Sequence, residues 1–561
     1  MLKKIQSRPN LIPIILLLIC SIFVCIPLFS SEIDISYDDG VQHIARLIGT
    51  EASIKEGQTS IMSDFCNGFG YSWNLFYSPV TAFLPLLFRV FGCSYVNCIK
   101  LFMFFVTFIS GIAMYFFTKD VTKNRKIAVI SGIIYIFVPY RFTDMYLRNA
   151  LAELTSFAFI PMIFQGLYGI MKQKQNREVI FIIGTSLLIL THTVVTLYMA
   201  IICFIYLLTQ FKQLKIKNVR RKLIYSIIVI LLITSFFLLP LLQVKNSAQY
   251  EVFKPGRMER TDVLIAFKLD IIELFMTPNG SIMIFQIGLL NLIALIFTPL
   301  VIKKIRVKYK NTDFYKLYIF SIFMFLILSF MTLKVFPFEK LPGILKMIQF
   351  TFRLLEFTSF FISFIVAVNI GKLFKDLRYR TIILIMIFTM IFSAFFIPSI
   401  KFTGEIDETK LIPAVPVTEK TGRVHAGCAS FEYLPSKAFE NRKYIETRNN
   451  EIIVLNGEAE INNYTKNKSR LEFDIKAKDV ELELPYIYYP GYTVKIENEE
   501  VKTYETEKGF VGVKINDIDN KTAKVEYTGT ILMKLSKIIS LFGIVLLVVP
   551  IIIRKVKNNK Q

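Results

Sequence analysis

The residues best suited to chemistry follow the first long apolar segment of the chain. Asp38 and Asp39 are adjacent acids, and we expect a helix to begin directly after them. His43 and Arg46 then follow Asp39 at four and seven residues, a spacing that puts all three on one helix face. Paired acids just outside a membrane span can act as a base or hold a divalent cation such as Mg²⁺ or Mn²⁺, and His with Arg can neutralise a phosphate. The competing interpretation is a helix N-cap with a solvated polar face.

The opposite face of this expected helix is apolar and can lie on a membrane surface; it consists of Val41, Ile44, Ala45 and Ile48. Glycines and aromatic side chains follow, around the only tryptophan of the chain. Glycines let the backbone approach a ligand, and aromatic rings at an interface suit a carbohydrate or a lipid headgroup. Trp73 and Tyr77 are therefore candidate sugar- or acceptor-binding residues. A residue of an interfacial aromatic belt is an equal account of Trp73.

Other polar and charged residues lie at the ends of later apolar segments: Tyr140, Arg141, Asp144, Arg148, Glu153, His192, Gln349, Arg353 and Glu356. Charges near hydrocarbon are costly and indicate a functional site by default. We expect a phosphate to be bound by His43, Arg46, Arg141, Arg148, His192 and Arg353, and an acceptor by Glu153. The alternatives are helix-end pairs, Arg148 with Glu153 or Arg353 with Glu356, and a capped turn at His192.

The elements that position these residues cross a membrane. Of the 561 residues, 54% are hydrophobic and 19% are charged, whereas a soluble domain has about 45–50% apolar and about 25% charged residues. Apolar runs long enough to span about 30 Å of hydrocarbon occur at 11–30, 99–118, 127–143, 150–170, 223–243, 282–301, 317–333, 354–370, 381–399 and 531–553. The stretch 179–209 is interrupted around His192 and predicts a hairpin of two more spans. The sequence therefore predicts about twelve spans in total.

The connections between these spans alternate in charge. Seven segments contain 30 Lys and Arg residues against four acids: 1–10, 119–126, 172–178, 211–222, 301–316, 371–380 and 554–561. They account for more than the whole formal charge of +23, so the basic balance reports topology and excludes a nucleic-acid partner. The sequence thus predicts a multi-pass protein of the bacterial cytoplasmic membrane with both termini cytoplasmic. The first span follows a basic segment, and we interpret it as a retained signal anchor.

Three long segments then fall on the extracytoplasmic side: 31–98, 244–281 and 400–530. The last of these alternates apolar and polar residues between Asn, Gly and Asp turns, which predicts a compact β-sandwich. Its tyrosines at 486, 488, 489 and 492 suit either a sugar platform or the sandwich core, and the core is favoured. The predicted domains are therefore a transmembrane domain 1–399, a β-rich domain 400–530, and a last span with a basic tail, 531–561.

The seven cysteines show neither a C-x-x-C motif nor a metal-binding spacing. We expect packed or free thiols. A disulfide between Cys66 and Cys93 or Cys98 is the alternative on the oxidising side of the membrane.

Together these motifs resemble a known family. Asp-Gly-x-x-His-x-x-Arg at 39–46, Gly-x-Gly-Tyr at 68–71, Phe-Tyr-x-Pro at 76–79 and Arg-x-x-x-x-Glu at 148–153 are similar to those of the bacterial 6-pyruvoyl-tetrahydropterin synthase-related multi-span membrane proteins. These in turn resemble YfhO-like proteins and the GT-C superfamily of membrane glycosyltransferases. Residues 484–492 resemble the YfhO-like outer domain. The chain shows no soluble pterin-synthase domain and lacks the several His ligands of such an enzyme.

The resemblance implies transfer of a sugar from a polyprenyl-phosphate donor on the outer leaflet, with an acid of the first outer loop as catalytic centre. Asp38 and Asp39 both match the acidic motif by position. The acceptor would be an envelope polysaccharide, a teichoic-acid-type polymer or a lipid. In this hypothesis Asp39 or Asp38 deprotonates the acceptor hydroxyl or holds a cation, while the arginines stabilise the leaving phosphate.

Two other classes of protein fit the chain. A flippase or polymer exporter predicts polar residues through the span centres and broken helices in matching halves, and the sequence shows neither. A non-enzymatic assembly scaffold for the cell envelope would tolerate loss of Asp38 and Asp39, whereas an enzyme would not.

Overall fold

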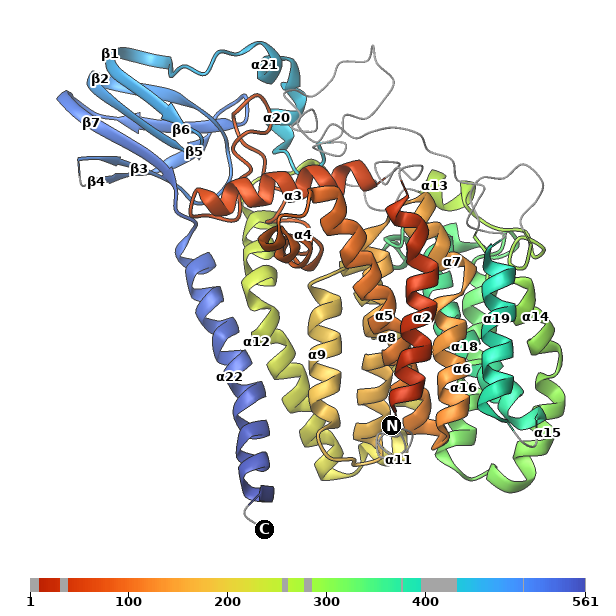
Figure 1. The fold of residues 1–561 in the computed structure, drawn as a ribbon. Helices are drawn as coiled ribbons and strands as arrows, with labels where there is room; N and C mark the ends of the chain where they lie inside the picture. Colours follow the sequence, from red (N-terminus) through yellow and green to blue (C-terminus); the bar gives the residue numbers. More distant parts are fainter. Residues whose placement is uncertain are drawn as a thin grey trace.

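The computed structural model describes residues 10–30, 39–254, 261–276, 285–374, 377–394, 431–497 and 499–559. A helical bundle carries a β-rich domain on one of its ends (Figure 1). The first helix begins and the last helix ends at the opposite end of the bundle. Asp38 and Cys428 lie outside the described residues.

The helices of the first half are α2 (Leu11–Cys25), α3 (Gly40–Lys55), α4 (Val80–Leu86), α5 (Tyr95–Thr122), α6 (Arg125–Ile136), α7 (Pro139–Phe142), α8 (Leu151–Met171), α9 (Arg177–Ile189), α10 (Thr193–Thr209), α11 (Phe211–Leu214) and α12 (Lys217–Ser247). Those of the second half are α13 (Thr261–Ala266), α14 (Leu289–Ile296), α15 (Thr298–Tyr309), α16 (Asp313–Met331), α17 (Gly343–Lys346), α18 (Leu354–Leu373), α19 (Tyr379–Ala394), α20 (Ser436–Glu440), α21 (Arg442–Thr447) and α22 (Ile531–Asn559). Short 3₁₀ turns are η1 (Ile26–Phe29), η2 (Leu87–Phe91), η4 (Glu251–Phe253), η5 (Phe338–Lys340) and η6 (Thr351–Arg353), and η3 (Thr143–Leu147) is a π-helix.

Fewer helices than predicted are long enough to cross a membrane. Within the described residues seven helices are sufficiently long and apolar, or eight when the bent pair α6 and α7–η3 is taken as one span. The predicted twelve spans are therefore not reproduced, because several apolar runs form short helices. The hairpin 179–209 does form, but α9 has 13 residues, or about 20 Å of helix. The run 282–301 is broken between α14 and α15, where Pro299 stands at the start of the second helix.

The basic connections meet at one end of the bundle. Arg177 after α8 pairs with Asp120 of α5 at 2.7 Å, and Lys222 of α12 pairs with Glu178 of α9 at 3.0 Å. Lys172 also forms an ion pair with Asp313 at the start of α16. These contacts show that four of the seven basic segments lie together, at the end away from the β-domain (Figure 1).

Small residues allow some of the helices to pack closely. A side chain at Gly132 of α6 would come within 2.8 Å of the Gly111 carbonyl oxygen on α5, and one at Gly166 of α8 within 2.4 Å of the Phe181 backbone nitrogen on α9. This is the packing expected where lipid gives helices no hydrophobic reason to associate.

The β-rich domain is confirmed, but its strands form one sheet instead of the two sheets of the predicted sandwich. The strands are β1 (Ile453–Asn467), β2 (Arg470–Ile487), β3 (Tyr492–Ile496), β4 (Glu499–Val501), β5 (Thr503–Glu505), β6 (Phe510–Ile515) and β7 (Ile518–Tyr527). All pairings are antiparallel, in the order β4-β3-β7-β2-β6-β5, with β1 along the other edge of β2. The sheet stays continuous because β2 is 18 residues long and pairs β7 with its first half and β6 with its second.

The first loop contributes to the hydrophobic core of this domain. Side chains between Ile61 and Phe76 pack into the same cluster as strands β2, β3, β6 and β7. The backbone turns through left-handed conformations at residues 66–68 and at Gly70, and the Phe69 carbonyl oxygen accepts a hydrogen bond from the Ile487 N–H at 2.9 Å. The glycines of this loop therefore serve a tight turn against the sheet.

Three of the four tyrosines of the predicted platform lie in the core. These are Tyr486, Tyr489 and Tyr492, and each is at most 5% exposed. Cys66, Cys93 and Cys98 are free thiols, so the alternative of a disulfide among them is wrong. The reason is geometric, since Cys66 belongs to the core of the β-domain and Cys98 to that of the bundle.

Candidate functional site

Asp39 lies at the start of α3, as predicted. It holds the N-cap position of the helix, yet its side chain makes no capping hydrogen bond. Its backbone N–H donates to the Arg148 carbonyl oxygen at 3.1 Å. The acidic motif of the first loop is thereby held against the residues that precede α8.

Arg46 lies on the same helix and is fully buried. Its guanidinium donates to the Asn74 side-chain oxygen at 3.1 Å, to the Thr81 hydroxyl at 3.3 Å and to the carbonyl oxygens of Tyr77 and Ser78 at 2.9 and 3.1 Å. It also stacks over the Tyr77 ring at 4.7 Å. Arg46, predicted to bind a phosphate, thus has its donors engaged in fixing the loop 74–81.

His43 is buried beside this loop, with its ring edge-on to Tyr77 at 6.3 Å between ring centroids. Its Nδ1 atom has no hydrogen-bond partner. Burial, with the positive charge of Arg46 nearby, lowers the pKa of His43 from 6.5 to about 3. A neutral imidazole at this depth can accept or donate a proton, but it is not a standing positive charge for a phosphate. The α3 face that carries His43 and Arg46 is therefore enclosed. The competing interpretation of a solvated polar face does not hold for these two residues.

The strongest electrostatic contacts converge on Glu153, near the start of α8. Arg148 grips its carboxylate with two hydrogen bonds of 2.8 and 2.9 Å, and the Arg353 Nε donates to it at 2.7 Å. The Tyr140 hydroxyl adds a bond of 2.8 Å. Glu153, predicted to bind the acceptor, instead orients two arginines from α7–α8 and from η6. The predicted pair of Arg148 and Glu153 forms, whereas Arg353 pairs with Glu153 and not with Glu356.

A broken helix supplies the residues around Arg148. The bundle segment α6–α7–η3 bends by 43°, and the Arg148 N–H donates to the Thr143 carbonyl oxygen five residues earlier, a π-type bond of 2.8 Å. Asp144 on this π-turn pairs with Arg148 at 2.9 Å. Such π-turns are frequent at functional sites, because they re-aim side chains that a regular helix would bury elsewhere.

The hairpin tip between α9 and α10 closes the site on another side. The Val80 N–H donates to the Leu190 carbonyl oxygen at 2.9 Å, which joins the first loop to this tip. His192 caps α10, with its Nδ1 accepting from the Val195 N–H at 3.4 Å, so the predicted capped turn is present. Burial and the nearby charge of Arg353 lower the pKa of His192 to about 3. Tyr77 also belongs here, since burial and the Asp39 carboxylate raise the pKa of its phenol.

Arg141 and Glu356 form a second, deeper group within the bundle. Arg141 is 1% exposed, donates to the Thr107 hydroxyl at 2.9 Å and stacks on Phe157 at 4.8 Å. Its other two guanidinium nitrogens and both carboxylate oxygens of Glu356 have no hydrogen-bond partner. Arg141 therefore does not join the arginines at Glu153, and its role in phosphate binding stays a prediction.

Trp73 is placed apart from these charges. It is 3% exposed and packs between Tyr71 and Tyr433, with ring centroids 6.1 and 6.4 Å away. This position joins the first loop to the β-domain and offers no ring face to a sugar. Its predicted role in binding sugar, and its alternative as an aromatic belt residue, are both replaced by a core position.

Within the described ranges no group of three or more His, Cys, Asp or Glu side chains could hold a metal ion. The predicted cation site used Asp38 together with Asp39, and Asp38 lies outside those ranges. A divalent cation at this pair therefore stays a prediction.

Sequence reasoning missed the residues that hold the site together. Asn74 and Thr81 share the guanidinium of Arg46, and Tyr433 of the β-domain stacks on Phe76 at 5.0 Å. The pattern of a buried arginine followed by a polar loop could have indicated the first contacts. No sequence signal indicates the last one, because it joins segments more than 350 residues apart.

With this geometry in view, comparison with known proteins decides the family. The family model of the 6-pyruvoyl-tetrahydropterin synthase related domain, described as a membrane protein, matches residues 75–400. The chain belongs to this family. The match covers more than half of the chain and contains Arg148, Glu153 and Arg353.

One relative is a protein from Lactococcus lactis subsp. cremoris (strain MG1363) whose name is "Uncharacterized protein". It is 24% identical over 251 residues, which is 42% of this chain and 40% of the relative. The chain therefore matches less than half the length of that relative. The family description and the seven long apolar helices among the described residues together identify a multi-pass membrane protein.

Proposed function

We propose that the protein is a membrane glycosyltransferase of the GT-C type that transfers a sugar from a polyprenyl-phosphate donor to an envelope acceptor. In this proposal the β-domain lies on the outer face of a bacterial cytoplasmic membrane and both termini are cytoplasmic. The gathering of the basic connections at the end of the bundle away from the β-domain supports this orientation.

The observation that carries the proposal is the junction of Asp39 with the two arginines. The backbone of Asp39 is bonded to Arg148, and Arg148 shares the carboxylate of Glu153 with Arg353. The backbone of an acid from the first loop is thus fixed beside Arg148, whose partner Glu153 also holds Arg353. A base beside cations is what displacement of a phosphate leaving group requires.

In the proposed step, an acceptor hydroxyl oxygen attacks the anomeric carbon of the donor sugar. The bond from that carbon to the phosphate oxygen breaks, and its electron pair leaves on the polyprenyl phosphate. The hydroxyl proton passes to the carboxylate of Asp39 or Asp38. The new glycosidic bond forms with inversion at the anomeric carbon, and atoms and charge balance with no redox partner.

The two arginines retain donors for the leaving phosphate. The Nη atoms of Arg148 donate to Asp144 and Glu153. The Nε of Arg353 donates to Glu153, and its Nη1 donates to the Gln349 side chain and to a carbonyl oxygen. The Nε of Arg148 and the Nη2 of Arg353 make no hydrogen bond to a described residue. Glu153 keeps both groups rigid, which lowers the reorganisation that the transition state would otherwise require.

The aspartates must also be made effective as bases. An ordinary aspartate, with a pKa of about 3.9, is a weak base, so partial burial or a bound Mg²⁺ or Mn²⁺ would have to assist. Asp39 is partly buried.

The test is sugar transfer by purified, detergent-solubilised protein given a panel of radiolabelled polyprenyl-phosphate sugars and envelope extract as acceptor. We expect Asp39→Asn to reduce transfer by about 100-fold or more, as loss of a general base does. Asp38→Asn measures the share of its neighbour. Glu51→Gln, further along α3 and paired with Arg89 at 2.9 Å, is the matched control and should keep its activity.

The outcomes separate the alternatives. Full transfer by both Asp variants would remove the proposed catalytic centre. Absence of transfer by the wild type from every donor would favour the exporter or the scaffold. Addition of EDTA to the same assay tests the cation, because only a metal-dependent site loses activity and regains it with Mg²⁺ or Mn²⁺.

A further inference from the structure

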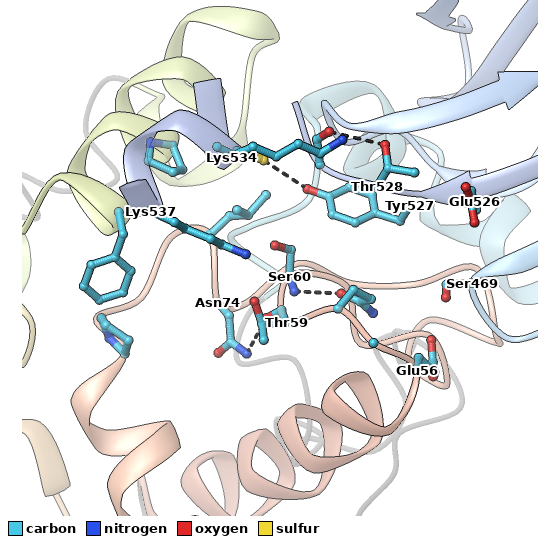
Figure 2. Close-up of a pocket in the computed structure, with 18 of the residues that line it drawn as sticks. Glu56, Thr59, Ser60, Asn74, Ser469, Glu526, Tyr527, Thr528, Lys534 and Lys537 are labelled. Carbon is cyan, nitrogen blue, oxygen red and sulfur yellow. Dashed lines mark hydrogen bonds between the residues drawn. The ribbon is translucent and has the colours of Figure 1, made fainter. Parts of the chain in front are cut away.

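A cavity of about 330 Å³ lies between the β-domain and the last span, away from the charged site. Figure 2 shows its walls, which come from the end of α3, the loop 57–60, the loop 74–79, α12, the end of β7 and the start of α22. None of Asp39, His43, Arg148, Glu153 and Arg353 lines it. The cavity is therefore a separate feature of the fold.

Two cations of α22 line the cavity without a counter-charge. Lys534 and Lys537 are three residues apart on one face of the helix, and Figure 2 shows both along the same wall. No carboxylate in the described part of the chain pairs with either. Of the two acids that line the cavity, Glu56 accepts from the Ser63 hydroxyl at 2.6 Å and lies 3.8 Å from Lys468, and Glu526 is the cross-strand neighbour of Arg470, a further cation of the lining.

The remaining walls divide into a polar and an apolar part. Ser60 of the first loop and Thr528 after β7 supply hydroxyl groups, whereas the Asn74 amide is bonded to Arg46, Thr50 and Thr59. Phe83, Phe236 and Phe237 supply rings on the side of the bundle, where α12 is a membrane span. The span α22 begins four residues after β7 ends, so the cavity lies where the bundle meets the β-domain (Figure 1).

We propose that this cavity binds an amphiphile whose anionic phosphate lies between Lys534 and Lys537 and whose apolar chain runs over Phe83, Phe236 and Phe237. Two lysines without counter-charge favour an anionic group, and lysines at a membrane surface attract phosphate-bearing lipids. The polar wall hydrogen-bonds the headgroup, and the aromatic floor excludes water from the first part of the chain. The inference does not depend on the proposed sugar transfer.

Two sources supply this chemistry, an anionic phospholipid of the membrane and a polyprenyl phosphate. The test is native mass spectrometry of the full chain, delipidated in detergent and then titrated with phosphatidylglycerol, phosphatidylcholine or undecaprenyl phosphate. We expect a bound phosphatidylglycerol or undecaprenyl phosphate at concentrations where phosphatidylcholine does not bind. The tighter of the two identifies the source.

Three variants locate the site. The double variant Lys534→Gln/Lys537→Gln should weaken binding of the anionic amphiphile on the order of tenfold, because each lysine loses its attraction for the phosphate. Thr59→Phe should weaken it by filling the cavity while both lysines remain. Lys245→Gln, an exposed lysine at the end of α12 outside the cavity, is the matched control and should bind as the wild type does.

Equal binding of phosphatidylcholine and the anionic lipids would overturn the proposal, as would wild-type affinity in the double variant. Retained affinity in Thr59→Phe would place the lipid on the outer surface of α22 and would contradict binding in the cavity. An equal loss in Lys245→Gln would show a general surface attraction and would also overturn it. Thermal unfolding of each variant in the same detergent verifies that the fold is intact.

Discussion

Two groups of buried charge lie near each other in the bundle, and they are built in opposite ways. Around Glu153 every carboxylate oxygen is bonded to an arginine or a tyrosine, at 2.7 to 2.9 Å. Around Glu356 neither carboxylate oxygen has a partner, and two nitrogens of Arg141 are also unbonded. Paired charge at such a depth holds segments in place, while unpaired charge costs free energy that only water, a ligand or neutralisation can offset.

The difference teaches which group is structural and which is available. Glu153 joins α8 to η6 across 200 residues of sequence, so its bonds define the geometry of the site. Arg141 and Glu356 make no hydrogen bond to each other. The predictions below test this contrast.

Removing the central carboxylate should have the largest effect. Glu153→Gln leaves Arg148 and Arg353 buried without a full counter-charge, and breaking a buried pair in this way costs about 3–5 kcal/mol. Thermal or denaturant unfolding in detergent measures the loss, with Glu51→Gln as the control on a half-exposed ion pair. A loss no larger than that of the control would show that the contacts at Glu153 do not stabilise the bundle.

The second prediction concerns pH and the unpartnered His43. Its pKa is about 3 in the folded protein against 6.5 ordinarily, so the unfolded chain binds a proton more readily in this range. Stability should therefore be complete above pH 6.5 and fall as the pH falls toward 3, by about 2 kcal/mol at pH 5.

His43→Gln should remove that part of the pH dependence of unfolding, measured from pH 7 to pH 5. An unchanged pH dependence of the unfolding free energy in the variant would mean that folding does not lower the pKa of His43. His192, whose pKa is also lowered, contributes in the same direction and remains in both proteins, so the difference between them isolates His43.

The smallest effect is expected at Glu356. Because the Glu356 side chain makes no hydrogen bond, Glu356→Gln replaces a buried carboxyl group without breaking a pair, and stability should change by less than about 1 kcal/mol or rise. The same unfolding experiment serves as the measurement. A loss comparable to that of Glu153→Gln would abolish the contrast between the two groups and would indicate a hidden partner for Glu356.

The helix after the acidic pair and the hairpin around His192 could be predicted from sequence, because both follow from local spacing and composition. The start of α3 at Gly40 and the turn between α9 and α10 lie where they were expected. For the charged residues of the site, the sequence predicted which side of the membrane they share but not which of them are in contact. Which arginine meets Glu153 depends on how α18 packs beside α8, and no local pattern carries that information.

Neither the number of spans nor the packing of the first loop follows from hydropathy alone. Hydropathy reports that a segment avoids water, whether lipid or protein surrounds it. The loop from Ile61 to Phe76 is apolar because it packs against protein, whereas α14 is apolar with only Asn291 buried and is eight residues long. Trp73 was misplaced likewise, since an aromatic ring suits an interface and a core equally well.

The helix α22 has a consequence for how the β-domain responds to the membrane. It touches α12 through a seam of hydroxyl groups, with Ser235 3.0 Å from the Ser540 hydroxyl, and only 17% of its span is buried in the protein. Its span of 23 residues is about 35 Å long, more than the hydrocarbon thickness of about 30 Å, so the helix must tilt or the bilayer must deform. Because β7 leads into this helix within four residues, a tilt of α22 that bilayer thickness imposes is transmitted to the β-domain.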